Sequence, residues 1–401
     1  MSNMLLDRKI IEKFLIYWEK NGFQRSNSAT IIPFSNWKHT LFVNSGLINH
    51  LSLIDRFGSL ISSVCLCQPC IKAGTSYFSL ENMVLKDGYF TFFEQLSCGG
   101  NQEIPVSWFI EKIWSYLVET MGLSAKKIFI GIPDSYSDFV QNWIQTGVPM
   151  GNILCPDPQA FKFELKGGQV SGSYNSIYYD RKDSCGFVCE ENICDINCSC
   201  GRFLEIGDVG IIYSGKERII DHGIGLERLL SVVQKLSKVT DIEEIQVILT
   251  ILRGVGIREE CQLSIIADHL RTVLMILSLG IKPGNKGRGY VARLLLRRVF
   301  WKAYKSGFST KFANGDIYRN ILPILEKRLS EKVLSDKEVI SEIKKEYIKF
   351  KILVERGSDI IKKMKRKTSV FSDSSAEFIY KTYGLPREIA ENLFYLEDKL
   401  F

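Results

Sequence analysis

The sequence predicts an α+β protein in which an antiparallel sheet flanked by helices is followed by an all-helical part. Runs of β-branched and aromatic residues that are typical of strands occur up to about residue 220. From about residue 240 onward, apolar residues recur almost throughout at helical spacing. A chain of 401 residues, 45% of them hydrophobic, is long enough to bury more than one core. We therefore predict one domain over residues 1–240 and a helical domain over residues 241–401.

The individual elements follow from local patterns of apolar residues. Residues 5–22 place Leu6, Ile10 and Trp18 on one face of a helix that ends at a Gly. A second helix is expected to begin at Pro105, because proline suits the first turn of a helix and an amphipathic pattern follows it. Strands are predicted at residues 40–44, 62–67, 89–96, 127–132, 176–179 and 203–213.

Charge is distributed unevenly along the chain. Residues 251–401 carry 30 Lys and Arg against 18 Asp and Glu, which indicates that the second half meets a polyanion. The alternative is that the Lys-rich helices are merely solvated, and we favour it for residues 341–368 taken alone. No run of about 18 apolar residues and no signal-peptide pattern is present, so we expect a cytoplasmic protein that does not bind a membrane.

Five of the eleven cysteines lie within sixteen residues, in a loop over residues 185–200. They are Cys185, Cys189, Cys194, Cys198 and Cys200. Four thiolates in this loop could close a tetrahedral Zn²⁺ site and fasten a segment that has few apolar residues of its own. The spacing lacks the paired C-x2-C units of common zinc ribbons, so reduced loop cysteines are the alternative.

The stretch I-I-D-H-G-I-G-L-E-R-L-L at residues 219–230 reads as a junction between a strand and a helix. Asp221 follows a β-rich run, and Gly223 and Gly225 allow a close approach of the backbone to a ligand. Arg228 is then expected to project from the first helical turn toward the sheet, where a guanidinium can grip a polyphosphate. The alternative is a Gly-containing turn before a helix with a solvated Glu and Arg.

Three further segments make the chain recognisable, in this order and at these separations. They are F-V-N-S-G-L (42–47), T-F-F-E-Q-L (91–96) and A-D-H-L-R…P-G-N-K-G-R-G-Y-V-A-R-L-L-L-R-R (267–298). With the stretch at 219–230, which is similar to motif 3, the set resembles the catalytic half of alanyl-tRNA synthetases, a class II synthetase family. Residues 374–386 resemble the end of that family's helical tRNA-recognition region, and the cysteine loop is similar to an insertion in some bacterial members.

The resemblance implies a class II synthetase sheet that binds ATP and Mg²⁺, forms an aminoacyl adenylate and passes the acyl group to the 3′ end of a tRNA. It also implies roles for individual residues. Arg228 and Lys72 would hold the phosphates, and Phe92 or Phe93 would line the adenine slot. Glu94 and Gly225 would belong to the nucleotide site, and Asp221 would receive the substrate's amino group. The alternatives are a surface salt bridge for Arg228, core positions for the two Phe and a helix N-cap for Asp221.

The chain departs from the family in the motif 2 strand, where P-C-I-K-A-G-T-S replaces R-C-V-R-A-G-G-K. Pro69 and Ser76 therefore replace basic residues, and Lys72 replaces an Arg, which removes the bidentate fork. A further basic residue becomes Gly88, and two His become Tyr89 and Phe90. Because losing one donor at a developing charge costs on the order of 10²-fold in rate, these changes bear directly on activity.

The expected amino-acid pocket departs from the family as well. Gly207 replaces a Trp, Asp208 an Asn and Gly210 a Val, and Phe163 replaces another Trp. We expect a larger and more acidic pocket, in which Asp208 adds a charge next to Asp221. Such a pocket should discriminate poorly for alanine, because one methylene contact contributes only ~1–3 kcal/mol. It would suit a larger substrate or one with a second amino group.

The helical part contains the residues expected to bind the acceptor stem of a tRNA. Basic residues cluster on or beside one predicted helix, with a separate lysine near the C-terminus: Arg288, Arg293, Arg297, Arg298, Lys302 and Lys381. Lys381 stands where the family has an acid, which alters the expected readout of the stem.

We interpret the chain as a synthetase that activates alanine, or a related or larger amino acid, and transfers it to tRNA. No His follows His269, so we expect no editing by the family's His/Cys cluster. One alternative is a degenerate, non-catalytic synthetase that binds tRNA or a partner protein. The other is an enzyme that transfers the adenylated amino acid to a small molecule or a carrier.

Overall fold

The structure is a computed structural model, and it describes most of the chain. The described residues are 4–26, 30–34, 37, 39–51, 62–73, 87–132, 137–155, 162–165, 170–181, 194–196, 198, 200–328, 332–366, 368–383 and 385–395. They form two compact units: Met1–Leu249 with Arg328–Glu331, and Thr250–Lys327 with Lys332–Phe401. The predicted division at residue 240 comes nine residues before the observed one, because helix α7 (Glu243–Val255) contributes its first turns to the first unit.

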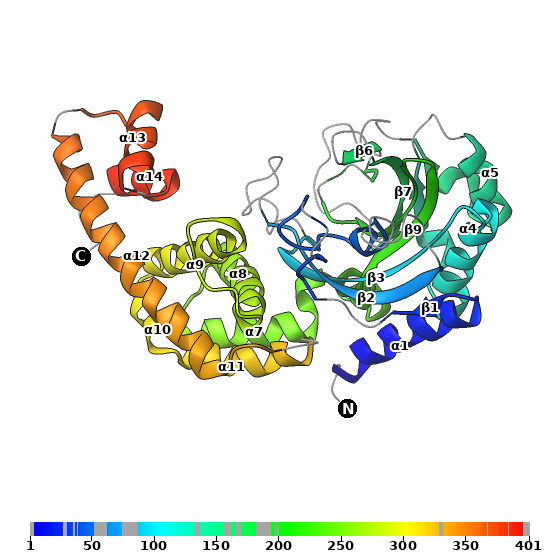
Figure 1. The fold of residues 1–401 in the computed structure, drawn as a ribbon, viewed down its shortest axis with the longest axis horizontal. Coiled ribbons are helices and arrows are strands. Elements are labelled where there is room, and N and C mark those ends of the chain that lie inside the picture. The colour runs from blue at the N-terminus through cyan, green and yellow to red at the C-terminus, as the bar shows by residue number, and fades with distance from the viewer. Residues whose placement is uncertain are drawn as a thin grey trace. The chain divides into compact units, whose positions relative to one another are not determined.

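The first unit is built on a nine-stranded sheet (Figure 1). Its main path runs β1 (Gln24–Arg25), β2 (Val64–Ile71), β3 (Phe92–Gly100), β9 (Glu217–Gly225), β8 (Phe203–Ser214), β7 (Val170–Asp180), β4 (Ile128–Gly131) and β5 (Ile153–Leu154), and β6 (Lys162–Leu165) pairs with β7. The pairs β1–β2 and β4–β5 are parallel, and the others are antiparallel. The predicted antiparallel sheet is thus correct for the central strands, whereas the edges make the sheet mixed.

Helices close one face of this sheet. Trp18 of α1 (Met4–Lys20) and Phe109 of α4 (Val106–Ser115) both pack against the ring of His222 on β9. His222 is completely buried, and burial lowers its pKa to about 4. Since side chains alternate along a strand, Asp221 and Gly223 point to the other face of the sheet. Further helical segments that the structure describes in this unit are η1 (Tyr116–Thr120), η2 (Ala125–Lys127), α5 (Ser137–Gln145), η3 (Met150–Asn152), α6 (Leu226–Val233) and η6 (Val239–Asp241), and residues 47–51 are helical as well.

Strand β8 contains a bulge that determines which of its side chains share a face. Tyr178 of β7 pairs with Glu205, but the preceding Ile177 pairs with Gly207, so Ile206 is an extra residue on β8. Without the bulge, Glu205 and Asp208 would point to opposite faces, because they are three residues apart. With it, both project from the face that the helices leave open.

Most of the predicted elements of the first unit are confirmed, and one is wrong. The helix expected at residues 5–22 is α1, and the helix expected from Pro105 begins with that residue as its N-cap. The strand predicted at residues 40–44 is a loop. Its Val43 N–H donates to the carbonyl of Ile31 (2.9 Å), and its carbonyl accepts from the N–H of Ile71 (2.8 Å). These isolated bonds satisfy the backbone without forming a ladder.

The second unit is helical in all of its regular elements that the structure describes, as predicted. Its helices after α7 are α8 (Glu260–Ser278), α9 (Gly287–Lys305), α10 (Ser309–Asn314), α11 (Asp316–Leu325), η7 (Glu326–Arg328), α12 (Asp336–Lys365), α13 (Asp373–Tyr383) and α14 (Arg387–Tyr395). Helix α8 is long and apolar enough to cross a membrane, but 89% of its apolar window is buried inside the protein. It packs against α9 and α11 and is the core helix of this unit.

Candidate functional site

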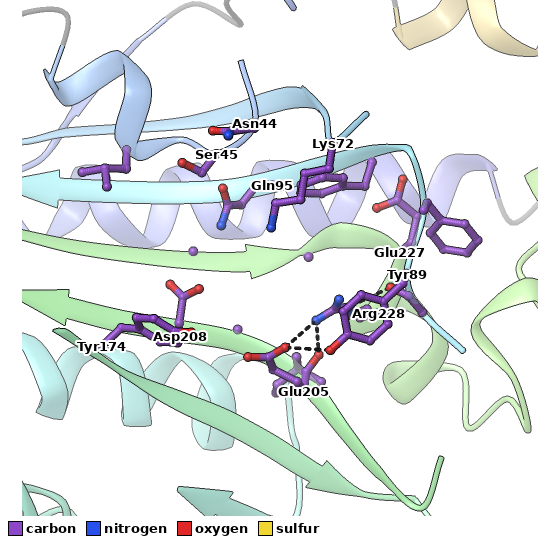
Figure 2. A pocket seen from close by; sticks show the side chains of 18 of the residues that line it. Asn44, Ser45, Lys72, Tyr89, Gln95, Tyr174, Glu205, Asp208, Glu227 and Arg228 are labelled. Atoms are coloured by element: carbon purple, nitrogen blue, oxygen red, sulfur yellow. Dashed lines mark hydrogen bonds and ion pairs between the residues drawn. The ribbon is translucent and has the colours of Figure 1, made fainter. Parts of the chain in front are cut away.

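A cavity of about 550 Å³ opens on the uncovered face of the sheet. Seven of the predicted site residues line it: Lys72, Phe93, Phe163, Gly207, Asp208, Gly225 and Arg228. Figure 2 shows Asp208 and Tyr174 toward one end of the cavity and Arg228 and Tyr89 toward the other. Asn44 and Ser45 cover it from the loop that follows Val43.

Arg228 turns from the first turn of α6 onto the sheet, as predicted. Its Nε donates to the carbonyl of Gly88 (2.8 Å), and its Nη1 donates to the carbonyl of Glu205 (2.7 Å) and reaches the carboxylate of the same residue (3.3 Å). The guanidinium also lies 4.4 Å from the ring centre of Tyr89. Arg228 is thus fixed in place before any ligand arrives, and part of its charge is already offset by Glu205.

Lys72 is the second cation of the cavity. It follows the end of β2, and its Nζ lies 5.4 Å from the ring centre of Phe93. A compact ammonium over an aromatic face can shift without breaking a fixed hydrogen bond, unlike the forked guanidinium of Arg228. The cavity therefore has one fixed and one adjustable positive charge on its walls.

The opposite wall of the cavity is acidic. Glu205 accepts from Ser176 (2.8 Å) and faces Arg228, and although burial opposes it, the nearby guanidinium and this hydrogen bond hold its pKa below the usual value. The pKa of Asp208 is shifted in the opposite direction. Burial, together with the negative charges of Asp221 and Glu205, raises its pKa to about 7. The prediction that Asp208 lies next to the charge of Asp221 agrees with this effect of Asp221 on Asp208.

Asp221 is placed differently from the expectation. It is nearly buried, and its carboxylate lies 2.9 Å from Nδ1 of the fully buried His50. It does not line the described cavity, and neither does Gly210, which is its cross-strand partner on β8. The described cavity therefore gives a substrate's amino group no direct access to the Asp221 carboxylate, which is the contact that the resemblance implies.

Two residues implied for the nucleotide site lie on the covered face of β3. Phe92 is completely buried, which agrees with the alternative that it is a core residue. Phe93 points into the cavity. Glu94 pairs with Arg328, which also bonds Glu244 and lies 2.8 Å from Asp7. Alternation along β3 explains both outcomes, since residues 92 and 94 share one face and residues 93 and 95 share the other.

The glycines of the site make room for neighbouring protein atoms. A Cβ at Gly207 would overlap the carbonyl oxygen of Gly223, and one at Gly223 would overlap the amide group of Gln95. At Gly225, a Cβ would contact the side chain of Arg228 at 3.4 Å. Residue 207 therefore has no room for a large side chain, because the backbones of β8 and β9 lie close together there. Protein atoms occupy part of the space by which the pocket was expected to be larger.

Three cysteines of the predicted metal loop lie together. The sulfurs of Cys194, Cys198 and Cys200 are all within 4.8 Å of one another, and those of Cys194 and Cys200 are 3.6 Å apart. Cys185 and Cys189 lie outside the described residues.

The basic residues predicted to bind tRNA do not form one open stripe. Arg293 and Arg297 both pair with Glu346, a carboxylate that is buried on α12 (3.0 and 2.9 Å). Lys302 is buried, whereas Arg288 and Arg298 are half-buried. Lys381 is exposed and pairs with Glu377 one helical turn away (2.6 Å).

Several residues of the site had no role in the sequence interpretation. Asn44, Ser45 and Gln95 stand inside the segments that carried the resemblance, so their position in those segments was an available signal. His50 and Glu205 are different. Their partners are distant in sequence, Asp221 lying 171 residues after His50, and only the fold brings them together.

The fold and the site together define a class of protein. A mostly antiparallel sheet, closed by helices on one face, with an arginine from the helix after its central strand turned onto the open face, is the arrangement that the resemblance to class II synthetases implies. The family model described as tRNA synthetases class II (A) matches residues 9–399, so the chain belongs to this family.

Several individual proteins are similar to this chain. Alanine–tRNA ligase of Thermoanaerobacter sp. is 27% identical over 413 residues, which cover 96% of this chain and 46% of that protein. Alanine–tRNA ligase 1 of Lachnoclostridium phytofermentans is 28% identical over 417 residues, or 97% and 46% of the two chains. The chain thus spans about half the length of these relatives. Among solved structures, apo histidyl-tRNA synthetase of S. aureus is 12% identical, with a TM-score of 0.37 over 64% of this chain and 77% of that one.

Proposed function

We propose that this protein uses ATP to activate an amino acid, alanine or a related or larger one, and transfers it to the 3′ end of a tRNA. The observation that carries the proposal is the position of Lys72 and Arg228 on one cavity with Asp208. Cations serve a polyphosphate, and a carboxylate serves an ammonium, so a single cavity offers complementary charges to both substrates.

In the first step the carboxylate oxygen of the amino acid attacks the α-phosphorus of ATP, a phosphorus–oxygen bond forms, and pyrophosphate leaves. The chain's own contribution is to offset the negative charge that accumulates on the phosphates. Arg228 does so from a fixed position and Lys72 from an adjustable one. Phe93 offers an aromatic surface on which adenine can stack.

The cavity residues also fit a Mg²⁺ ion. Glu227 lines the cavity beside Arg228, and carboxylate oxygens are the ligands that Mg²⁺ prefers. A bound ion would supply further positive charge at the phosphates.

We further propose that the helical unit contacts the acceptor stem. Lys381 is the exposed member of the predicted set, while Arg293 and Arg297 support Glu346. An exposed lysine held by a single surface ion pair can exchange that partner for a phosphate at little cost.

A structural zinc ion at Cys194, Cys198 and Cys200 is also proposed. Thiolates bound at about 2.3 Å in a tetrahedron place their sulfurs roughly 3.8 Å apart. The separation of 3.6 Å between Cys194 and Cys200 fits this geometry, and the sequence offers Cys185 and Cys189 as sources of a fourth ligand.

One observation favours a second candidate, a non-catalytic synthetase that binds tRNA or a partner. Arg228 is already engaged by Glu205, and Pro69 stands where the family has a basic residue, so the site has less positive charge to offer a phosphate. A protein of this kind would still bind through its helical unit without consuming ATP.

Acid-gel electrophoresis of a tRNA pool incubated with the protein, ATP and radiolabelled amino acids tests the proposal. We expect one or more labelled tRNA bands that depend on ATP and disappear when the tRNA 3′ end is oxidised with periodate. Binding of tRNA without ATP consumption would instead support the non-catalytic candidate. ATP consumption without labelled tRNA would support transfer to a small molecule or carrier.

A further inference from the structure

Asp208 differs from two nearby carboxylates, those of Glu205 and Asp221, in having no side-chain partner among the residues that the structure describes. Glu205 faces Arg228 at 3.3 Å, and Asp221 faces His50 at 2.9 Å. Among the residues that the structure describes, no ion pair or side-chain hydrogen bond reaches the carboxylate of Asp208. It is half-buried and lines the cavity, so a ligand in the cavity can reach it.

The sheet geometry explains why this carboxylate is left in such a position. The bulge at Ile206 brings Glu205 to the same face as Asp208. The register between β8 and β9 places Asp208 opposite Gly223 and Gly210 opposite Asp221, so Asp221 also lies on this face. Across the strands Asp208 therefore faces Gly223, which has no side chain, and Ser176, whose hydroxyl donates to Glu205.

These surroundings destabilise the charged form of Asp208. Partial removal from water and two neighbouring negative charges both oppose ionisation. The two cations of the cavity, Lys72 and Arg228, favour ionisation but rank below these effects. A positive group brought by a ligand would supply the compensation that the protein itself does not.

We propose that Asp208 binds a primary ammonium group of the amino-acid substrate, the function implied for Asp221, and that Asp221 is a positioning residue held by His50. This inference rests on the proposed function, because it assigns the ammonium subsite of the same cavity. The ammonium can come from two sources: the α-amino group of any amino acid, or the side-chain amine of a short diamino acid.

The surroundings of Asp208 agree with a subsite for a small cation. Tyr174 lies beside it on the neighbouring strand and lines the same end of the cavity (Figure 2). Nδ1 of His222 lies 2.5 Å from the backbone carbonyl oxygen of Asp208 on the covered side of the sheet. The charged groups that act on it are Asp221, Glu205, Lys72 and Arg228. None of the four occupies the position of a bound ammonium at its carboxylate.

The test is steady-state pyrophosphate exchange by the wild type and three variants, with L-alanine and with L-2,3-diaminopropionate. Asp208→Asn keeps the shape of the side chain and removes its charge, and Asp221→Asn does the same at the alternative residue. Glu217→Gln is the matched control, because Glu217 lies at the far end of the same β8–β9 pair and does not line the cavity.

We expect Asp208→Asn to raise the KM for the amino acid about 10- to 100-fold while the KM for ATP stays within about twofold. Glu217→Gln should match the wild type. A loss with both amino acids assigns the α-amino group to Asp208, and a loss confined to diaminopropionate assigns its side-chain amine. Equal KM values for Asp208→Asn and the wild type, or a loss found only with Asp221→Asn, would overturn the inference and leave the proposed function intact.

If the wild type shows no exchange, the proposed function fails, and binding decides the inference separately. Calorimetric titration of the two amino acids into the wild type and Asp208→Asn then gives the answer. Binding that weakens at least tenfold in Asp208→Asn supports the ammonium site. Equal binding, or no binding of either amino acid to the wild type, overturns it.

Discussion

Replacement of Arg228 by Met should weaken ATP binding far more than it disturbs the fold. Met retains most of the volume and removes the guanidinium. A hydrogen bond to a charged partner contributes about 1.5–3 kcal/mol, and every 1.4 kcal/mol is about tenfold in affinity. Nε of Arg228 is already bonded to Gly88 and Nη1 to Glu205, so we count only one net new bond to a phosphate. The dissociation constant for ATP should therefore rise about 10- to 150-fold.

Isothermal titration calorimetry with ATP and Mg²⁺ measures this change directly. Arg202→Met is the matched control, because Arg202 is also paired with a carboxylate and stacked on an aromatic ring. It contacts Asp180 at 2.9 and 2.7 Å and lies 4.9 Å from the ring centre of Phe203, outside the cavity. The exposed fractions of the two arginine side chains are similar, 18% for Arg228 and 23% for Arg202.

Both variants leave a carboxylate without its cation, so both should lower the melting temperature by similar amounts. Only Arg228→Met should lose ATP affinity. Equal ATP affinities for Arg228→Met and Arg202→Met, with both proteins folded by circular dichroism, would refute the role given to Arg228.

Three further predictions concern the ion pairs of Arg328, the cysteine loop and Asp208. Arg328→Met leaves buried carboxylates unpaired and should lower stability by about 3–5 kcal/mol, on the order of 10 °C in thermal melting, whereas the half-exposed Arg25→Met should have little effect. A similar melting temperature for both variants would contradict the buried cluster. The wild type should contain one zinc per chain by plasma emission spectrometry and Cys198→Ser well under one, while Cys261→Ser should match the wild type. A metal-free wild type with intact thiols would exclude the site. The affinity for the amino acid should fall as the pH drops below about 7, because Asp208, whose pKa is raised to about 7, then becomes protonated and no longer attracts an ammonium; Asp208→Asn should show no such dependence.

The features that could be predicted from the sequence are those that depend on local patterns. Helix α1 follows from the spacing of Leu6, Ile10 and Trp18, and the junction at α6 follows from two glycines between an apolar strand and an apolar helix. The direction in which Arg228 projects follows from its position in the first turn of that helix.

The features that could not be predicted depend on pairing across the sheet. The sequence of β8 does not reveal that Ile206 is bulged, yet that one residue decides whether Glu205 and Asp208 share a face. The environment of Asp221 depends on His50, and that of Glu94 depends on Arg328, 234 residues later in the chain. Alternation alone separates Phe92 from Phe93, but only the face covered by helices shows which of them is in the core.

The proposed function requires that the cavity activates an amino acid with ATP. Amino-acid-dependent exchange of radiolabelled pyrophosphate into ATP, screened over the twenty standard amino acids and diaminopropionate, measures this chemistry without requiring the correct tRNA. We predict exchange with at least one amino acid, reduced at least tenfold in Arg228→Met and unchanged in Glu217→Gln. No exchange with any of them by folded protein that binds ATP, with and without added tRNA, would contradict the proposed activation of an amino acid.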